Sequence, residues 1–247
     1  MPSRRKWMMT GLAASAAGAV SLKLAAHKGL IPPDHGGIYG PGATLTYAAQ
    51  RLLTRGAMAR EYPRAAISPK PFANPTQFRN DAYDQMAKDG FRAWRLRIEG
   101  SVTRPREYSL DQLRQLPVRS QATQMICEEG WSFIAEWAGV ELAGLLGDAG
   151  MRAETKFIVY ESMEQGWWDS LDLDDAMHPQ TLVAHSMNGS ELPSAHGGPL
   201  RMRVPRQIGY KSVKYLARII ATDDLRKFGK GLGSPGPEYG YSWYAGI

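Results

Sequence analysis

Alternating apolar and polar positions predict strands through most of the chain from residue 92 onward. Residues 92–100 place apolar side chains between arginines, which is the period of a half-buried strand. Further strands are predicted at residues 120–127, 156–162, 181–189, 199–205 and 215–223. The run at 156–162 is apolar without alternation, which indicates burial on both faces. An Asn-Gly pair ends the strand at 181–189 and is typical of a hairpin turn.

Helical patterns separate these strands. Residues 109–117 open with a serine cap and close at a proline, as a short helix does. Residues 137–150 predict a helix with three leucines on one face, ended by glycine, and residues 171–179 predict a short capped helix. The expected fold class is therefore α+β, and the second half of the chain is mostly β.

The first 90 residues have less regular patterning. Residues 31–75 are rich in proline, glycine and alanine, and we expect an irregular N-terminal arm with one short helix around residues 47–58. Residues 76–90 predict a helix or a loop that lines a site. The main domain is expected to span residues 76–247, as one unit or two closely packed lobes.

Residues 1–30 have the pattern of an export signal. A charged start that contains Arg4 and Arg5 precedes a weakly apolar stretch, and the paired arginines match the twin-arginine type of leader. The apolar stretch stops at Lys23 and is short for the roughly 20 residues that span a bilayer. We expect export to the periplasm. An uncleaved membrane anchor stays open as an alternative, because no small-x-small cleavage site is visible near residues 25–26.

Charge and cysteine content narrow the classes of function. The net charge is +6, but part of the excess lies in the leader and the other basic residues form no long run, which argues against nucleic-acid binding. A basic interior pocket for a phosphorylated ligand would use the same charge. The single cysteine, Cys127, excludes an intramolecular disulfide, and a lone cysteine is most often a small buried hydrophobe.

Four segments carry a family resemblance through both their residues and their order. They are residues 125–142 (MICEEGWSFIAEWAGVEL), 171–205, 207–219 (QIGYKSVKYLARI) and 238–247 (EYGYSWYAGI). Together they resemble the oxidoreductase molybdopterin-binding domain of the sulfite oxidase superfamily, and most closely the catalytic subunits of bacterial periplasmic methionine sulfoxide reductases. The resemblance covers roughly residues 76–247. It implies a mixed, β-rich fold that binds molybdenum with molybdopterin.

The resemblance assigns Cys127 as the protein ligand to molybdenum and as the catalytic residue. In this family the metal is held by two dithiolene sulfurs of the pterin and one protein thiolate, and soft thiolates suit such a metal. Only the deprotonated thiol can act as a ligand. Glu128 and Glu129 follow Cys127 directly and would raise the thiol pKa, so the positive charge of the metal must keep the sulfur ionised.

The resemblance also implies a set of residues that bind the cofactor. Arg201 would contact the pterin, and His196 occupies a pterin-binding position where the sulfoxide reductases often have Asn. A guanidinium with nearby backbone N–H groups suits a phosphate, and the paired glycines at 197–198 allow close backbone approach. Without the resemblance, this segment is a glycine-rich turn with a solvated arginine.

A second segment would complete the phosphate cradle. The family pattern implies that backbone amides near Ser212 and Val213, with the ammonium of Lys214, hold the phosphate. Ser162 aligns with a threonine that contacts the cofactor in the sulfoxide reductases. Asn80 lies near an early asparagine with the same role, through the similarity of N-D-A-Y to N-N-F-Y.

Other candidates are weaker. His178 and His185 match no zinc signature with one cysteine available, and His178 is expected to cap or pack against a helix. Trp137 is expected in the core. Trp167 and Trp168 fit either the core or the wall of a substrate funnel.

The residues beside Cys127 decide the expected reaction. Sulfite oxidases of the superfamily usually show Cys followed by a Gly-Asn-Arg stretch, whereas this chain has Glu128-Glu129-Gly130-Trp131. Close carboxylates repel sulfite by about 1 kcal/mol or more per exposed pair. Reduction of a neutral S-oxide or N-oxide is therefore predicted. Sulfite oxidation and a non-catalytic pterin-fold binding module are the alternatives.

The sequence also bears on the electron donor. It has no haem-attachment motif and no nucleotide-binding motif. We therefore expect electrons from a membrane partner linked to haem or quinone.

The leader hypothesis makes a direct prediction. Replacing Arg4 and Arg5 together with lysine keeps the charge and removes only what an arginine-reading receptor detects, so the holoprotein should accumulate in the cytoplasm. Cell fractionation measures this. Unchanged export would indicate a general secretory leader or an anchor.

Overall fold

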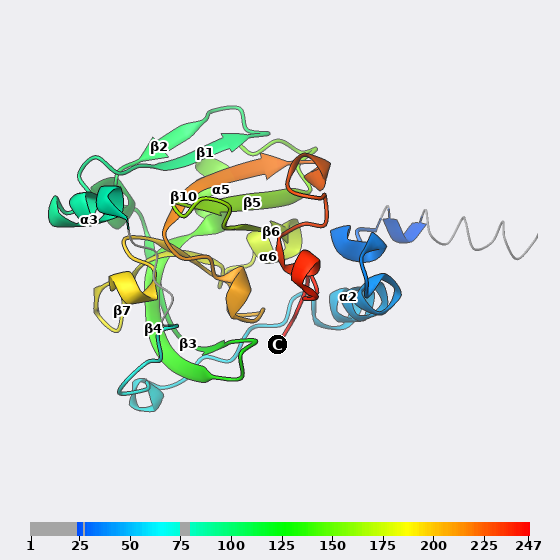
Figure 1. The fold of residues 1–247 in the computed structure, drawn as a ribbon, viewed down its shortest axis with the longest axis horizontal. Helices are drawn as coiled ribbons and strands as arrows, with labels where there is room; N and C mark the ends of the chain where they lie inside the picture. Colours follow the sequence, from blue (N-terminus) through cyan, green and yellow to red (C-terminus); the bar gives the residue numbers. More distant parts are fainter. Residues whose placement is uncertain (1–23, 27, 75–79) are drawn as a thin grey trace, which may run out of the picture.

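The computed structural model of the protein describes residues 24–26, 28–74 and 80–247, and within them ten strands form two five-stranded sheets (Figure 1). The strands are β1 (Leu96–Gly100), β2 (Arg106–Tyr108), β3 (Val118–Ile126), β4 (Ser132–Glu141), β5 (Phe157–Ser162), β6 (Trp168–Asp172), β7 (Leu182–Met187), β8 (Ser190–Glu191), β9 (Arg201–Arg203) and β10 (Leu216–Thr222). The helices are α2 (Gly40–Thr54), α3 (Asp81–Lys88), α4 (Leu110–Gln115), α5 (Leu142–Asp148) and α6 (Leu173–Ala176). Short 3-10 helices lie between them, and η3 (Ser194–His196) and η4 (Gly209–Lys211) belong to the site.

The first sheet has the strand order β2-β1-β10-β5-β6. β1 and β10 pair in parallel, with Ile98 opposite Ile219, and the other pairs are antiparallel. The second sheet has the order β3-β4-β7-β8, and β9 pairs with β7. In Figure 1 the first sheet fills the upper part of the view, and β3, β4 and β7 lie below it. The turn between β3 and β4 therefore belongs to a different sheet from the turn between β5 and β6.

One apolar core joins the two sheets. It contains Leu96, Ile98 and Ile219 from the first sheet and Val183 and Met202 from the second. The leucines of α4 and α5 complete it: Leu110, Leu113, Leu142, Leu145 and Leu146. A smaller cluster of Met125, Phe133, Ala135, Trp137, Ala184, Met187 and Leu192 lies along the second sheet, beneath the site. Trp137 is fully buried there, as predicted.

Most of the predicted elements are confirmed. Ser109 caps α4 in a complete capping box with Gln112. The hairpin of β7 and β8 turns at Asn188 and Gly189, whose positive φ angles of 53° and 77° match the two-residue turn that Asn-Gly favours. His178 is buried after α6, and its Nδ1 accepts a hydrogen bond from the Gln180 amide. Strands β2, β4 and β6 have no counterpart among the predicted strands.

The helix expected over residues 137–150 is wrong at its start. Residues 137–141 are the end of β4, and α5 begins only at Leu142. The residues from Trp137 to Val140 pair with β3 along a nine-position ladder, which supplies the backbone hydrogen bonds that a helix would otherwise make. Gly139 permits close packing on β7, because a Cβ there would lie 2.1 Å from the carbonyl oxygen of Val183.

The N-terminal arm is more ordered than expected. The helix predicted around residues 47–58 is α2, which begins earlier and ends earlier than that range. Pro41 suits its first turn, where a backbone N–H has no helical partner. Figure 1 shows α2 beside α6 and the C-terminal segment, and Tyr47 packs against Trp243 and Tyr244 there. Asn80 caps α3, so the helical alternative for residues 76–90 holds where the structure describes them.

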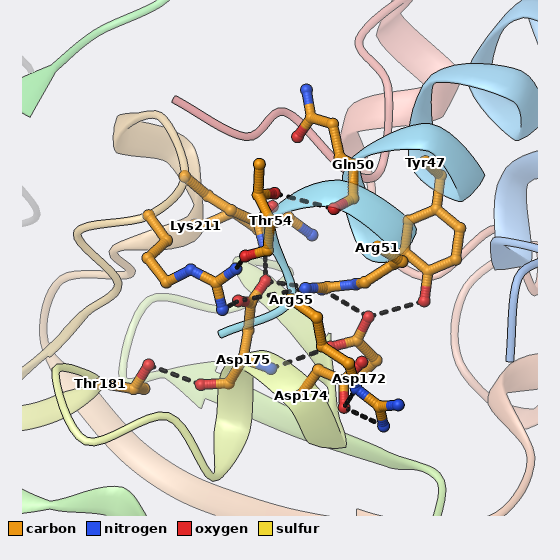
Figure 2. A network of polar contacts seen from close by, with 12 residues as sticks. Tyr47, Gln50, Arg51, Thr54, Arg55, Asp172, Asp174, Asp175, Thr181 and Lys211 are labelled. Carbon is orange, nitrogen blue, oxygen red and sulfur yellow. Dashed lines mark hydrogen bonds and ion pairs between the residues drawn. The ribbon is translucent and has the colours of Figure 1, made fainter. Parts of the chain in front are cut away.

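Buried charges attach α2 to the domain (Figure 2). Arg51 lies 2.5 Å from the Asp172 carboxylate and 2.7 Å from the Asp175 carboxylate, and all three side chains are nearly or fully buried. Tyr47 donates a hydrogen bond to Asp172, and Arg206 forms an ion pair with Asp175 at 2.9 Å. Each buried carboxylate therefore has a cation and further hydrogen bonds. Among the described residues, no helix combines the length and the apolar character needed to cross a membrane.

The buried network generates a stability prediction. Arg51→Met leaves two carboxylates buried without their shared cation, and should lower the free energy of unfolding by about 3–5 kcal/mol. Arg55→Met is a matched control on the same helix, because Arg55 is 71% exposed and its pair with Asp174 should contribute less than about 1 kcal/mol. Urea denaturation of the two variants measures the difference. Equal losses would contradict the role given to the network.

Candidate active site

Cys127 lies at the tip of the longest hairpin in the described structure. It follows the last residue of β3, and a tight turn returns the chain to β4: the Cys127 amide donates to the Trp131 carbonyl at 2.9 Å, and the Gly130 amide donates to the Cys127 carbonyl. Gly130 has φ of 90°, which glycine adopts without strain. The thiol is thus held at the end of a sheet on a short, hydrogen-bonded turn.

A cavity of about 270 Å³ opens beside the thiol. Most of its lining comes from three stretches of chain: the turn after β3, the turn between β5 and β6, and the segment from η4 to β10; Asn74, Met125 of β3 and Arg201 of β9 complete it. Its lining residues are Asn74, Met125, Cys127, Glu128, Glu129, Trp131, Glu164, Trp167, Arg201, Gly209, Tyr210, Ser212, Val213, Lys214 and Tyr215. Five of the eight residues predicted from the sequence are among them: Cys127, Arg201, Ser212, Val213 and Lys214.

The surroundings of Cys127 keep its thiol protonated in the protein alone. Burial, the largest cause, and the carboxylates of Glu128 and Glu129 together raise its pKa to about 12, against a lowering effect from the Glu129 backbone N–H. Sγ lies 3.4 Å from a Glu128 oxygen and 3.8 Å from a Glu129 oxygen. The effect of the glutamates expected from the sequence is confirmed in direction, although burial is the larger cause. A thiolate here requires a strong positive charge at the sulfur.

Arg201 brings positive charge to the wall of the cavity. Its side chain is buried, and its two terminal nitrogens donate to the carbonyls of His196 and Ser212 at 2.8 and 2.7 Å. Its Nε has no hydrogen-bond partner in the described structure, and the guanidinium lies over the Trp137 ring, 5.3 Å from the centroid. Burial lowers the pKa of Arg201 to about 10. The hydrogen-bond partners of Arg201 are neutral and no carboxylate in the described structure pairs with it, so an anion in the cavity would stabilise its charge.

Sequence analysis missed a second buried cation, Arg203. It is fully buried, donates from one nitrogen to Thr123 and to the Gln124 carbonyl, and leaves Nε and Nη1 without partners in the described structure. Burial, then the charge of Arg201, lowers its pKa to about 9. Alternation along Arg-Met-Arg places both arginines on one face of β9, and this pattern could have revealed the residue.

The segment from η4 to β10 contains two lysines, one in the core and one in the cavity wall. Lys211 points into the domain, where it forms a buried ion pair with Asp169 at 2.6 Å. Lys214 lines the cavity, and its Nζ donates to the Ala195 carbonyl at 2.8 Å. Burial, then the charge of Arg201, lowers the pKa of Lys214 to about 8. The Ser212 hydroxyl accepts a hydrogen bond from the Val204 amide, which ties this segment to the end of β9.

His196 supports Arg201 without lining the cavity. It ends η3, its carbonyl receives the Arg201 hydrogen bond, and its ring packs edge-on against Phe133 at 5.7 Å. Burial, then the charges of Arg201 and Lys214, lowers the pKa of His196 to about 4. The imidazole is therefore neutral at physiological pH and adds no charge to the site.

Asn80 and Ser162 also lie outside the cavity lining. Asn80 is exposed and caps α3 by accepting a hydrogen bond from the Tyr83 amide at 2.7 Å. Tyr83 in turn donates to the Gly198 carbonyl, which links α3 to the loop that carries His196. Ser162 accepts a hydrogen bond from the Glu164 amide at 3.0 Å and so shapes the turn between β5 and β6. In this structure both residues position neighbouring segments.

The turn shaped by Ser162 contributes residues that sequence reasoning did not assign to the site. Glu164 and Trp167 line the cavity from this turn, and Trp167 is 49% exposed. Trp168, by contrast, packs against Phe228 and belongs to a small apolar cluster with Val159, Ile220 and Leu225. The two tryptophans left open by the sequence therefore have different environments. Only the pairing of distant segments brings Glu164 to the same cavity as Cys127.

The donor set suits an anionic cofactor that carries a soft metal. A single thiol is present as a soft donor, and Arg201 and Lys214 provide positive charge at the inner wall. Gly209 lets the backbone of η4 pack closely against the end of β3 and Cys127. A Cβ at this position would lie 3.6 Å from Cys127 Cα and 3.2 Å from the Ile126 carbonyl oxygen. The residues of this cavity thus fit a molybdopterin group.

Comparison with known proteins agrees with this assignment. The family described as "Oxidoreductase molybdopterin binding domain" matches residues 83–227, and the chain belongs to this family. It is therefore an enzyme, a molybdopterin-dependent oxidoreductase, and the reading as a non-catalytic binding module is wrong. The molybdopterin-binding domain implies a molybdenum cofactor.

Two relatives refine the comparison. A protein of Azospira oryzae, provisionally named protein-methionine-sulfoxide reductase subunit YedZ1, is 31% identical over 195 residues, which cover 79% of this chain and 70% of that protein. The crystal structure of the sulfane dehydrogenase SoxCD from Paracoccus pantotrophus matches with a TM-score of 0.55 at 21% identity, over 68% of this chain and 46% of that chain. At this identity the second match shows a shared fold, which confirms the predicted sulfite-oxidase-type α+β class.

The low pKa of His196 predicts a pH dependence. Between about pH 6.5 and pH 4 the unfolded chain binds a proton at this histidine that the folded protein excludes, so its contribution to stability is lost as the pH falls. His196→Asn should therefore become more stable relative to wild type as the pH is lowered through this window. Urea unfolding of the apoproteins at pH 7.5, 6.5, 5.5 and 4.5 measures the difference. A pH-independent difference would contradict the assignment.

Proposed function

We propose that this enzyme reduces a neutral S-oxide or N-oxide at a molybdenum held by Cys127. The observation that carries the proposal is one cavity that joins a single thiol, inner cations and outer carboxylates. The reaction consumes two electrons and two protons and converts a sulfoxide into a sulfide and water. The relative from Azospira oryzae, named as a methionine-sulfoxide reductase subunit, supports this direction of the reaction.

Each cavity residue has a distinct role in the proposal. The bound molybdenum cofactor supplies the two-electron transfer of an oxygen atom, and the protein supplies ligation, orientation and electrostatics. Cys127 is the protein ligand of the metal. Arg201 and Lys214 would bind the anionic parts of the pterin, and the backbone at Ser212 and Val213 would hold its phosphate.

The remaining sequence candidates act through neighbours. His196 holds Arg201 through its backbone carbonyl, and its neutral ring leaves the positive charge of Arg201 available to the cofactor. Asn80 and Ser162 set the loops around the cavity.

The charge next to Cys127 separates the two candidate reactions. Glu128 and Glu129 both line the cavity, and neither has an ion-pair partner within the described structure. An anion such as sulfite must approach both carboxylates, and each close pair of like charges at the surface disfavours it by about 1 kcal/mol or more. A neutral oxide has no such penalty. Sulfite oxidation is therefore the second candidate, supported only by the shared fold.

We further propose export and a membrane electron donor. The paired arginines Arg4 and Arg5, which lie outside the described residues, match a twin-arginine leader. The relative from Azospira oryzae is named as a subunit, in agreement with a separate partner that delivers electrons. A haem- or quinone-linked membrane protein meets that need, because the chain contains no second redox motif.

Cys127→Ser tests the ligand assignment. A hydroxyl is a harder and far less acidic ligand than a thiol, so the variant should fold and retain pterin while its sulfoxide reduction falls below 1% of wild type. Metal analysis, pterin fluorescence and dye-coupled assays on sulfoxides, N-oxides and sulfite measure these properties. Turnover of the serine variant near the wild-type rate would contradict the assignment of Cys127 as the metal ligand. A wild type that oxidises sulfite faster than it reduces any neutral oxide would overturn the direction.

A further inference from the structure

The opening of the cavity carries three carboxylates that come from both sheets. Glu128 and Glu129 lie on the turn between β3 and β4, and Glu164 lies on the turn between β5 and β6. Glu128 and Glu129 are exposed, and Glu164 is partly exposed, whereas Arg201 on the same wall is buried. The cavity is therefore positive at its inner end and negative at its outer end.

These outer charges are not neutralised by the protein. In the described part of the chain, no lysine, arginine or histidine lies within 4.0 Å of the carboxylate oxygens of Glu128, Glu129 or Glu164. Glu129 accepts hydrogen bonds from Asn74 and from Trp131 Nε1, which are neutral donors that orient the carboxylate and leave its charge in place.

Lys214 is a cation in the cavity lining that interacts electrostatically with one of these carboxylates, Glu164. Its ammonium, however, donates to the Ala195 carbonyl and belongs to the segment proposed to bind the phosphate. The unpartnered Nε of the buried Arg201 independently indicates an anion at this inner end. With the cofactor bound there, the inner cations are matched, and the three outer carboxylates face the substrate.

Aromatic side chains accompany the carboxylates. Trp131, Trp167 and Tyr210 line the same cavity, and Trp131 is held between Phe72 at 4.8 Å and a stacked Phe133 at 6.0 Å. Aromatic faces attract organic cations, and the attraction grows where the site is partly desolvated. Carboxylates and aromatic rings around one opening are thus suited to a positively charged group of the substrate.

We propose that the enzyme selects oxides whose own molecule carries a cationic group close to the oxidised atom, such as a methionine sulfoxide residue flanked by lysine or arginine. The inference rests on the proposed reduction of a neutral oxide, and it adds Glu164 to Glu128 and Glu129 as a determinant of specificity. The neutral S=O group enters toward Cys127, and the cationic group stays at the carboxylates of the opening.

Three matched peptides test the proposal with the holoenzyme. Each contains one methionine sulfoxide, flanked by lysine, glutamine or glutamate, and kcat/KM is measured with a dye donor at low salt. The lysine peptide should exceed the glutamate peptide at least tenfold, with the glutamine peptide between them and most of the effect in KM. The ratio should fall at least threefold between about 0.01 M and about 0.5 M salt, because the carboxylates are exposed to solvent.

Variants locate the effect in the three carboxylates. Glu164→Gln, and separately Glu128→Gln with Glu129→Gln, should each reduce the lysine-to-glutamate ratio at least threefold while the glutamine peptide changes less. Glu154→Gln is the control, because Glu154 is exposed and lies outside the cavity lining. Metal and pterin contents of each variant, measured in parallel, detect any loss of the cofactor. A variant that slows all three peptides equally would count against a charge-selective role.

The outcomes separate this inference from the proposed function. Equal reduction of the three peptides, or preference for the glutamate peptide, would overturn the cationic substrate class and leave oxide reduction standing. Failure to reduce any peptide or small sulfoxide, together with rapid sulfite oxidation, would overturn the proposed function and the inference with it. A tenfold preference that Glu154→Gln retains and Glu164→Gln loses would support both.

Discussion

Arg201 and Arg203 project from the same face of β9, are almost fully buried, and have no carboxylate partner in the described chain. Burying an unmatched charge is unfavourable, so the surrounding structure has to hold both guanidiniums in place. It does so with backbone carbonyls, the Thr123 hydroxyl and the face of Trp137. The site is thus arranged to receive negative charge, and a pterin phosphate with its dithiolene sulfurs would supply it.

The thiol and the outer carboxylates follow from the same arrangement. The hairpin of β3 and β4 ends at Cys127, which lines the same cavity as Arg201, and its turn carries Glu128 and Glu129 toward solvent. Burial and the carboxylates keep the free thiol protonated. Ligation by this sulfur would therefore require the positive charge of a metal, and the same cavity holds buried positive charge and exposed carboxylates.

In contrast, buried charges that are paired with each other attach the N-terminal arm to the domain. Asp172 and Asp175 are buried, but Arg51 and Arg206 neutralise them and Tyr47 adds a hydrogen bond (Figure 2). The charges of this network are matched within the protein, whereas Arg201 and Arg203 have no carboxylate partner in the described chain. The contrast agrees with a structural role for the first cluster and with anion binding at the second.

Local patterns were sufficient for most strands, for the cap of α4 and for the turn at Asn188, because period, capping and turn chemistry act between residues close in sequence. The family resemblance predicted Cys127 and Arg201 as site residues, and both line the cavity. Pairing between distant segments decided the rest, such as the end of β4 as a strand and the burial of Arg203. It also placed Glu164 at the cavity and left Asn80 outside it, since no local signal encodes which turns of two different sheets meet.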